Sequence, residues 1–180
     1  MSEEYKLLKR NTIHNGVVID YYQDEILLPN GNKGLWDIVD HKGAAAVLPV
    51  LENGNLLMVR QYRYALGRYT IEIPAGGLNS REEPMIEAAA RELQEETGYT
   101  AGKLEFLMMC NTTVAFCNEK IGIYLATDLT PGEQHLDEDE FVTYEEHSLE
   151  ELCEKIYAGE ITDGKTVCAI LTYKSKYKIS

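Results

Sequence analysis

The first half of the chain is rich in apolar, β-branched and aromatic residues arranged in short runs, a pattern typical of β-strands. The run at 44–51 is the most continuous, and Asn53–Gly54 after it has the chemistry of a hairpin turn. We expect a strand-rich half with a boundary near His41. The expected strands are 5–13, 17–28, 34–41, 44–51, 56–62 and 69–73.

The second half mixes helical and extended patterns. A helix is expected to begin near Pro84, since proline is tolerated in a first helical turn, and to end at Gly98. Strands at 104–109 and 121–126 and helices at 149–157 and 165–173 follow. Because strands and helices alternate without a strict βαβ repeat, the sequence favours a mixed α/β or α+β fold. We expect an N-terminal antiparallel β layer over 1–42 and a larger domain over 43–180.

The charge of the chain excludes some classes of partner. The 180 residues contain 17 Lys and Arg against 30 Asp and Glu, a net charge of −13, which disfavours nonspecific binding to nucleic acids or anionic membranes. The sequence has no apolar run of about 20 residues, and its N-terminus lacks the apolar core of a signal peptide. Its four cysteines form no CxxC pair, which fits a reducing cytoplasm.

Three glutamates cluster within the expected helix at 84–97. Glu92, Glu95 and Glu96 lie at i, i+3 and i+4 and therefore on one face, in the half where the helix dipole disfavours anions. A second face is expected to pack on a sheet through Ile86, Ala90, Leu93 and Thr97. The three carboxylates form either a solvated acidic face or a site for a divalent cation, Mg²⁺ or Mn²⁺.

The full spacing around the glutamates favours the metal site. The pattern runs Gly77, Glu83, Arg91–Glu92–Leu93, Glu95–Glu96 and Gly98–Tyr99. It matches the Nudix box, and the chain resembles the Nudix hydrolases, which cleave a nucleoside diphosphate linked to another group. The resemblance implies an α/β/α sandwich with a mixed sheet and glutamates that bind the divalent metals used in catalysis.

The segments 59–63, 71–76 and 136–141 resemble the ADP-ribose pyrophosphatase branch of that family. This resemblance implies metal binding by Glu92, Glu95, Glu96 and a backbone carbonyl, of Ala75 in preference to Gly76. It implies catalytic roles for Glu95 and for Glu138 or Glu140, either of which could act as the base. The substrate-binding residues that it implies are Arg63, Trp36, Asp37, Glu72 and Glu119.

One segment departs from the branch. Val114 and Ala115 stand where the branch usually has proline and glycine, so the backbone at the terminal-ribose end of the cleft is expected to differ. The expected reaction is Mg²⁺-dependent or Mn²⁺-dependent cleavage of ADP-ribose to AMP and ribose 5-phosphate by a homodimer. The alternatives are the same chemistry on GDP-mannose, NADH or FAD, and a non-catalytic nucleotide sensor with the same fold.

Overall fold

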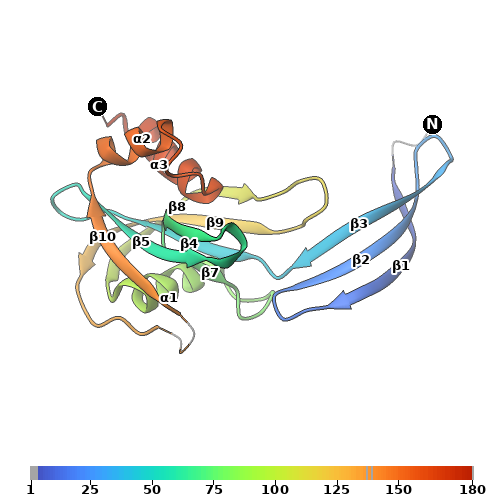
Figure 1. The fold of residues 1–180 in the computed structure, drawn as a ribbon, viewed down its shortest axis with the longest axis horizontal. Coiled ribbons are helices and arrows are strands. Elements are labelled where there is room, and N and C mark those ends of the chain that lie inside the picture. Colours follow the sequence, from blue (N-terminus) through green and yellow to red (C-terminus); the bar gives the residue numbers. More distant parts are fainter. Residues whose placement is uncertain (1–3, 137, 139, 180) are drawn as a thin grey trace. The chain divides into compact units, whose positions relative to one another are not determined.

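The computed structural model describes residues 4–136, 138 and 140–179 (Figure 1). The chain forms two compact units. The first unit is Met1–Gly43 with Asn111–Lys120, and the second is Ala44–Cys110 with Ile121–Ser180. The first unit therefore includes a segment that lies far along the sequence from its strands. Among the described residues, no helix is long and apolar enough to cross a membrane.

The first unit is a three-stranded antiparallel sheet in the order β1-β2-β3. Its strands are β1 (Lys6–Asn15), β2 (Ile19–Leu27) and β3 (Lys33–His41). The segment Asn111–Lys120 lies along β3, because the Val39 N–H donates to the Phe116 carbonyl over 2.7 Å and the Asn118 N–H donates to the Val39 carbonyl over 3.2 Å. This backbone pairing fixes the segment to the sheet.

The second unit contains two sheets. One is mixed, with the order β7-β4-β9-β8, in which β4 pairs parallel with β9 and antiparallel with β7; the other is antiparallel, with the order β10-β5-β6. The bounds are β4 (Ala44–Pro49), β5 (Leu56–Arg63), β6 (Arg68–Glu72), β7 (Ala75–Gly77), β8 (Thr100–Asn111), β9 (Lys120–Thr130) and β10 (Val142–His147). A 3₁₀ turn, Tyr64–Leu66, joins β5 to β6.

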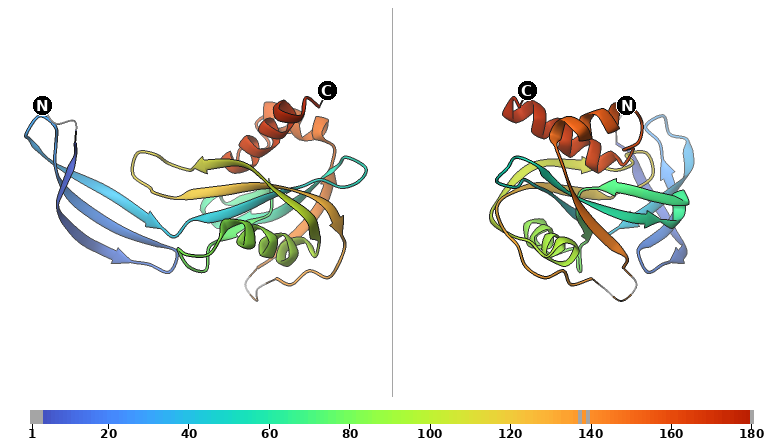
Figure 2. Two further views of the ribbon diagram at one scale, coloured as in Figure 1. Left: turned by 180° about the vertical axis from the view of Figure 1, so that it is seen from behind. Right: turned by 60° about the vertical axis from the view of Figure 1, so that its left-hand side comes forward.

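Helices cover both faces of the second unit: α1 (Met85–Thr97) on one side, and α2 (Leu149–Tyr157) and α3 (Gly164–Tyr177) on the other (Figure 2). Alternate residues of β4 explain this layering. Ala45 and Val47 pack in the cluster that contains Ala88, Ala89 and Leu93 of α1. Ala44, Ala46 and Leu48 pack instead in the cluster that contains Leu152 of α2 and Ile170 of α3. The expected α/β/α sandwich with a mixed sheet is confirmed.

Two strands were not expected from the sequence. Residues 74–77 were interpreted as the end of a strand run, but Ala75–Gly77 pairs with β4 as β7. Its alanine and two glycines carry no β-branched side chain, so propensity gave no signal. β10 has the polar sequence VTYEEH and is fixed by its pairing with β5 rather than by hydrophobic alternation.

The expected packing face of α1 was partly wrong. Leu93 and Thr97 are buried, but Ile86 is exposed and so is Ala90. The buried arc instead includes Ala88, Ala89 and two of the glutamates, Glu92 and Glu96. Part of the acidic face of the helix lies against the protein. A prediction that assigned only apolar residues to the buried face therefore placed that face incorrectly.

Candidate functional site

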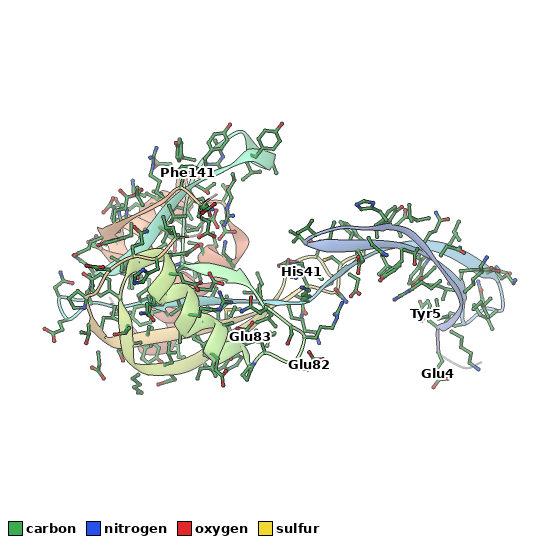
Figure 3. All side chains as sticks on the ribbon, turned by 90° about the horizontal axis from the view of Figure 1, so that it is seen from below. Glu4, Tyr5, His41, Glu82, Glu83 and Phe141 are labelled. Carbon is green, nitrogen blue, oxygen red and sulfur yellow. The ribbon has the colours of Figure 1, made fainter. Side chains whose placement is uncertain are left out.

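The ends of α1 are where the sequence placed them. Pro84 stands at the N-cap, and its fixed φ suits the entry to a helix. Gly98 ends the helix in the left-handed conformation, with φ +78°, which favours glycine. The segment before the helix carries Glu83, labelled in Figure 3.

Glu92 and Glu96 are buried glutamates one turn apart on α1, with 7% and 3% of their surface exposed. The strand β7 lies against both side chains. The Ala75 N–H donates to Glu96 Oε2 over 3.1 Å, and a Cβ at Gly76 would overlap the Glu92 carboxylate. The glycine therefore leaves the space in which that carboxylate lies.

The electrostatic environment of the pair disfavours two negative charges. Burial, with smaller contributions from the charges of Glu95 and Glu140, raises the pKa of Glu92 to about 6, although Arg91 opposes the shift. Burial, with the charges of Glu92 and Glu140, raises the pKa of Glu96 to about 8, against the Ala75 N–H and Arg63. Nearby cationic charge therefore compensates Glu92 in part and Glu96 less.

Arg91 connects the helix to the segment before it. Its Nη1 donates to Glu92 Oε1 over 2.6 Å and to Glu95 Oε2 over 2.9 Å, and its Nη2 donates to the Gly77 carbonyl over 3.1 Å. Its Nε lies 3.5 Å from the Glu83 carboxylate. Glu83 in turn accepts the Asn79 N–H. Arg91 thus orients two of the predicted metal ligands, and Glu95 stays partly exposed.

The residues around the pair fit a divalent cation. Among the described residues, no three His, Cys, Asp or Glu side chains stand in a group that could already hold a metal ion. However, Glu92 and Glu96 offer hard carboxylate oxygens, which Mg²⁺ and Mn²⁺ prefer, and a cation would relieve their mutual repulsion. Glu92, Glu96, Glu95 and the Ala75 carbonyl are the groups that would hold the metal.

The acidic segment before β10 contains the two candidate bases. Glu140 is half-buried and Glu138 is exposed. Because the charge of Glu140 acts on both Glu92 and Glu96, this carboxylate lies in the electrostatic range of the pair. Asp137 and Asp139, the other acids of the segment, lie outside the described residues.

Arg63 and Glu72, both expected to bind substrate, are paired with each other. Arg63 Nε and Nη2 donate to the two Glu72 oxygens over 2.7 Å each. The Thr70 hydroxyl donates to Glu72 Oε1 over 2.6 Å, and Lys165 donates to Glu72 Oε2. Desolvation opposes these partners, but together they lower the pKa of Glu72 to about 2. The structure thus gives Glu72 a fully paired, buried position.

Lys165 and Thr70 are the residues of this cluster that the sequence interpretation missed, and Lys165 is the charged one. It lies in the first turn of α3 and donates to Asp163 over 2.9 Å as well as to Glu72. Asp163 caps α3 by accepting the Thr166 N–H over 3.1 Å. The available signal was this Asp-x-x-Thr helix start, which places a lysine two residues after the cap, but no motif connects that lysine to Glu72.

Three expected substrate-binding residues belong to the first unit. Trp36 is 42% exposed and lines a cavity of about 400 Å³ with Leu35, Asp37, Ala115 and Phe116. Asp37 accepts the Tyr21 hydroxyl over 2.7 Å. Glu119 accepts the Thr112 hydroxyl over 2.8 Å and lies 3.5 Å from His41 Nδ1. The departure at Val114–Ala115 therefore falls in the segment that borders Trp36.

Comparisons with known proteins agree with this architecture. The NUDIX domain family matches residues 40–169. The chain is 43% identical to the ADP-ribose pyrophosphatase of Bacillus subtilis, over 94% of this chain and 92% of that protein. It is 40% identical to the methanol dehydrogenase activator of Bacillus methanolicus, over 93% and 91%.

Two less similar proteins extend the comparison. An ADP-ribose pyrophosphatase of Mycobacterium tuberculosis is 32% identical, over 93% of this chain and 82% of that protein. The crystal structure of an ADP compounds hydrolase superposes with a TM-score of 0.85 at 21% identity, covering 97% of this chain and 95% of that one. The resemblance inferred from the box is thereby confirmed, and the chain belongs to the NUDIX domain family.

Proposed function

We propose that this chain is a Mg²⁺-dependent or Mn²⁺-dependent pyrophosphohydrolase that cleaves ADP-ribose to AMP and ribose 5-phosphate. The observation that carries the proposal is the pair of buried glutamates, Glu92 and Glu96, packed against β7 with incomplete charge compensation. The names of the relatives from B. subtilis and M. tuberculosis, both ADP-ribose pyrophosphatases, support the substrate.

Each group of the site has a role in this reaction. A bound divalent cation would neutralise pyrophosphate oxygens and lower the pKa of a coordinated water. Glu92, Glu96 and the Ala75 carbonyl would hold it, and Glu95, oriented by Arg91, would complete the carboxylate set. Glu138 or Glu140 accepts the proton of the attacking water. Arg63, held in place by Glu72, would contact the substrate phosphates.

The first unit is proposed to bind the base and to form the dimer. The exposed indole of Trp36 offers a stacking surface at the edge of its cavity, with Asp37 and Glu119 as polar contacts. A three-stranded sheet has little core of its own, and exposed apolar side chains lie on it. They include Leu7, Leu8, Ile13, Val17, Val18 and Leu35. We propose that a second copy of the chain covers them.

Turnover of a substrate panel tests the proposed function. The purified protein is incubated with Mg²⁺ or Mn²⁺ and with ADP-ribose, GDP-mannose, NADH or FAD, and products are separated by chromatography. We expect fastest cleavage of ADP-ribose, and a loss of at least about 100-fold in kcat for Glu96→Gln. The matched control is Glu87→Gln, because Glu87 is an exposed glutamate on the same helix.

The panel also discriminates the alternatives. Faster turnover of GDP-mannose, NADH or FAD would keep the chemistry and replace the substrate. Tight binding of ADP-ribose without cleavage under either metal would instead identify a nucleotide sensor. Equal turnover by Glu96→Gln and the wild type would remove the buried pair from the mechanism and contradict the proposal. We also propose that the chain binds neither membranes nor nucleic acids, which its net charge of −13 supports, and that it is cytoplasmic, which its four cysteines without a CxxC pair support.

One comparison supports a second function. The relative from B. methanolicus, 40% identical, is named a methanol dehydrogenase activator. We propose that this chain can also raise the activity of such a dehydrogenase. Adding wild-type protein or Glu96→Gln to a methanol dehydrogenase assay tests this. Activation by the wild type alone would place the effect in the hydrolytic site, and activation by neither would refute it.

A further inference from the structure

The C-terminal end of α1 is capped by a different segment of the second unit. The last four carbonyls of a helix have no partner within the helix. Here the His135 N–H donates to the Glu95 carbonyl over 3.0 Å, and Gln134 Nε2 donates to the Glu96 carbonyl over 2.5 Å. α1 carries no basic residue in its last turn. The Gly98 N–H donates to the Gln94 carbonyl, and the Gln134 side-chain amide and the His135 backbone amide supply the donors for the next two carbonyls, those of Glu95 and Glu96.

The same Gln134 amide also contacts the start of β10. Its Nε2 donates to the Val142 carbonyl over 3.2 Å, and Val142 is paired with Gln61 of β5. One NH₂ group thus joins the helix that carries the buried pair to the strand that follows the acidic segment. Glu138 and Glu140 lie in the sequence between these two attachments, Gln134 and Val142.

Backbone contacts hold the beginning of this segment against the helix end. A Cβ at Gly98 would lie 2.7 Å from the Gly132 carbonyl oxygen and 2.9 Å from the Gln134 nitrogen. A Cβ at Gly132 would lie 2.8 Å from the Gly98 carbonyl oxygen. Neither position has room for a side chain. The segment between β9 and β10, seen beside α1 in Figure 2, is therefore fixed at Gly132–His135.

We propose that Gln134 is a positioning residue, which holds the segment of Glu138 and Glu140 in register with the Glu92–Glu96 pair. This inference rests on the proposed function, in which Glu138 or Glu140 accepts the proton of the attacking water. The NH₂ group of a glutamine has two N–H donors, one for each carbonyl, whereas an ionised glutamate side chain has none. A glutamate at position 134 would therefore place its oxygens against both carbonyl acceptors and repel them. Its two contacts join the carbonyl of one predicted metal ligand to the first residue of β10, directly after the segment of the base.

Steady-state kinetics on ADP-ribose with Mg²⁺ test the role of Gln134. We expect Gln134→Glu and Gln134→Ala to lower kcat by about 10-fold to 100-fold, because a displacement of about 1 Å costs that much, while KM changes less than about threefold. The matched control is Gln94→Glu, the same charge change at an exposed position of α1. It should retain the wild-type kcat.

Two further measurements separate positioning from general stability. Hydrogen exchange should become faster at the His135 amide in both Gln134 variants and stay unchanged in β4. In a background with Glu138→Gln and Glu140→Gln, the Gln134→Ala change should lower kcat by less than about twofold, since the group that it positions is absent.

The outcomes are distinct. If the wild type is active and both Gln134 variants keep its kcat, the positioning role is overturned. It is also overturned if Gln134→Ala lowers kcat by the same factor in the wild type and in the Glu138→Gln, Glu140→Gln background. A wild type that cleaves none of the panel substrates overturns the proposed function itself. A kcat loss confined to the background that retains Glu138 and Glu140, with faster exchange at His135, supports the proposal.

Discussion

Glu72 and Glu96 are equally buried glutamates of the second unit, each 3% exposed, with opposite electrostatics. Glu72 accepts from Arg63, Lys165 and Thr70, and its pKa is lowered to about 2. Glu96 has a backbone N–H from Ala75 and a neighbouring carboxylate, Glu92, and its pKa is raised to about 8. The same side chain is thus held ionised in one place and disfavoured as an anion in the other.

The difference separates a carboxylate whose charge the fold itself neutralises, Glu72, from one that it leaves available to a ligand in the proposed function, Glu96. Burial removes each carboxylate from water, which costs free energy. A buried, ionised carboxylate stabilises the fold only if hydrogen bonds and opposite charges offset that cost. The chain supplies the partners of Glu72 itself. For Glu96 it supplies too little, so a negative charge at this position weakens the metal-free fold, and in the proposed function a bound cation compensates it. An uncompensated buried carboxylate is therefore the stronger indication of a functional site.

The largest effect is expected when Glu72 and Glu96 are each replaced by glutamine. Glu72→Gln should lower the free energy of unfolding by about 3 kcal/mol, because it leaves Arg63 and Lys165 without their anion. Glu96→Gln should leave the free energy of unfolding unchanged or raise it. Urea denaturation at pH 7 with a chelator measures both values. Equal losses would show that burial alone, and not pairing, determines the effect.

The acid dependence of stability should come from Glu72. Its pKa is lower in the folded chain than in the unfolded chain, so its stabilisation is complete above about pH 4.5 and is lost as the pH falls toward 2. The shift corresponds to roughly 3 kcal/mol. Urea midpoints between pH 5 and pH 2.5 should therefore fall less steeply in Glu72→Gln than in the wild type. Parallel curves for the two proteins would contradict the pairing.

The environment of Glu96 was easier to predict from the sequence than that of Glu72. The i, i+4 spacing on a helix and the box made Glu92 and Glu96 candidate metal ligands, since local periodicity fixes which residues share a face. The partners of Glu72 could not be found in that way. Lys165 is far from Glu72 in the sequence, and only the packing of α3 brings them together. Arg63 and Glu72 were both predicted to bind substrate, which stays a prediction, but their pairing with each other was not predicted.

The helices and strands also divide into those that local sequence signals predict and those that depend on distant contacts. Helices with caps, such as α1 and α3, and apolar strands such as β4 have local signals and were predicted. β7 and β10 lack such signals, because a partner strand rather than composition holds them. The contacts of Gln134 were also beyond prediction, since a polar residue in a loop carries no pattern that identifies two carbonyl acceptors.

Stabilisation of the fold by Mg²⁺ should depend on Glu96 and not on Glu72. Mg²⁺ at about 100 times its Kd should stabilise the wild type by about 2.7 kcal/mol, since it binds the folded chain and not the unfolded one. The same addition should stabilise Glu72→Gln to a similar extent and Glu96→Gln hardly at all. Thermal denaturation with and without Mg²⁺ measures these shifts. A full shift in Glu96→Gln would place the cation elsewhere.

The smallest effect concerns the space beside the pair rather than its charges. Gly76→Ala would push a methyl group into the Glu92 carboxylate, whereas a Cβ at Gly77 meets nothing within 4 Å. Because a displaced Glu92 carboxylate would disturb its hydrogen bond with Arg91, we expect Gly76→Ala to weaken Mg²⁺ affinity about tenfold, or about 1.4 kcal/mol. Gly77→Ala, the neighbouring control, should stay within about twofold of the wild type. Calorimetric titration with Mg²⁺ compares them, and equal affinities would show that Glu92 does not need the room left by Gly76 to bind the cation.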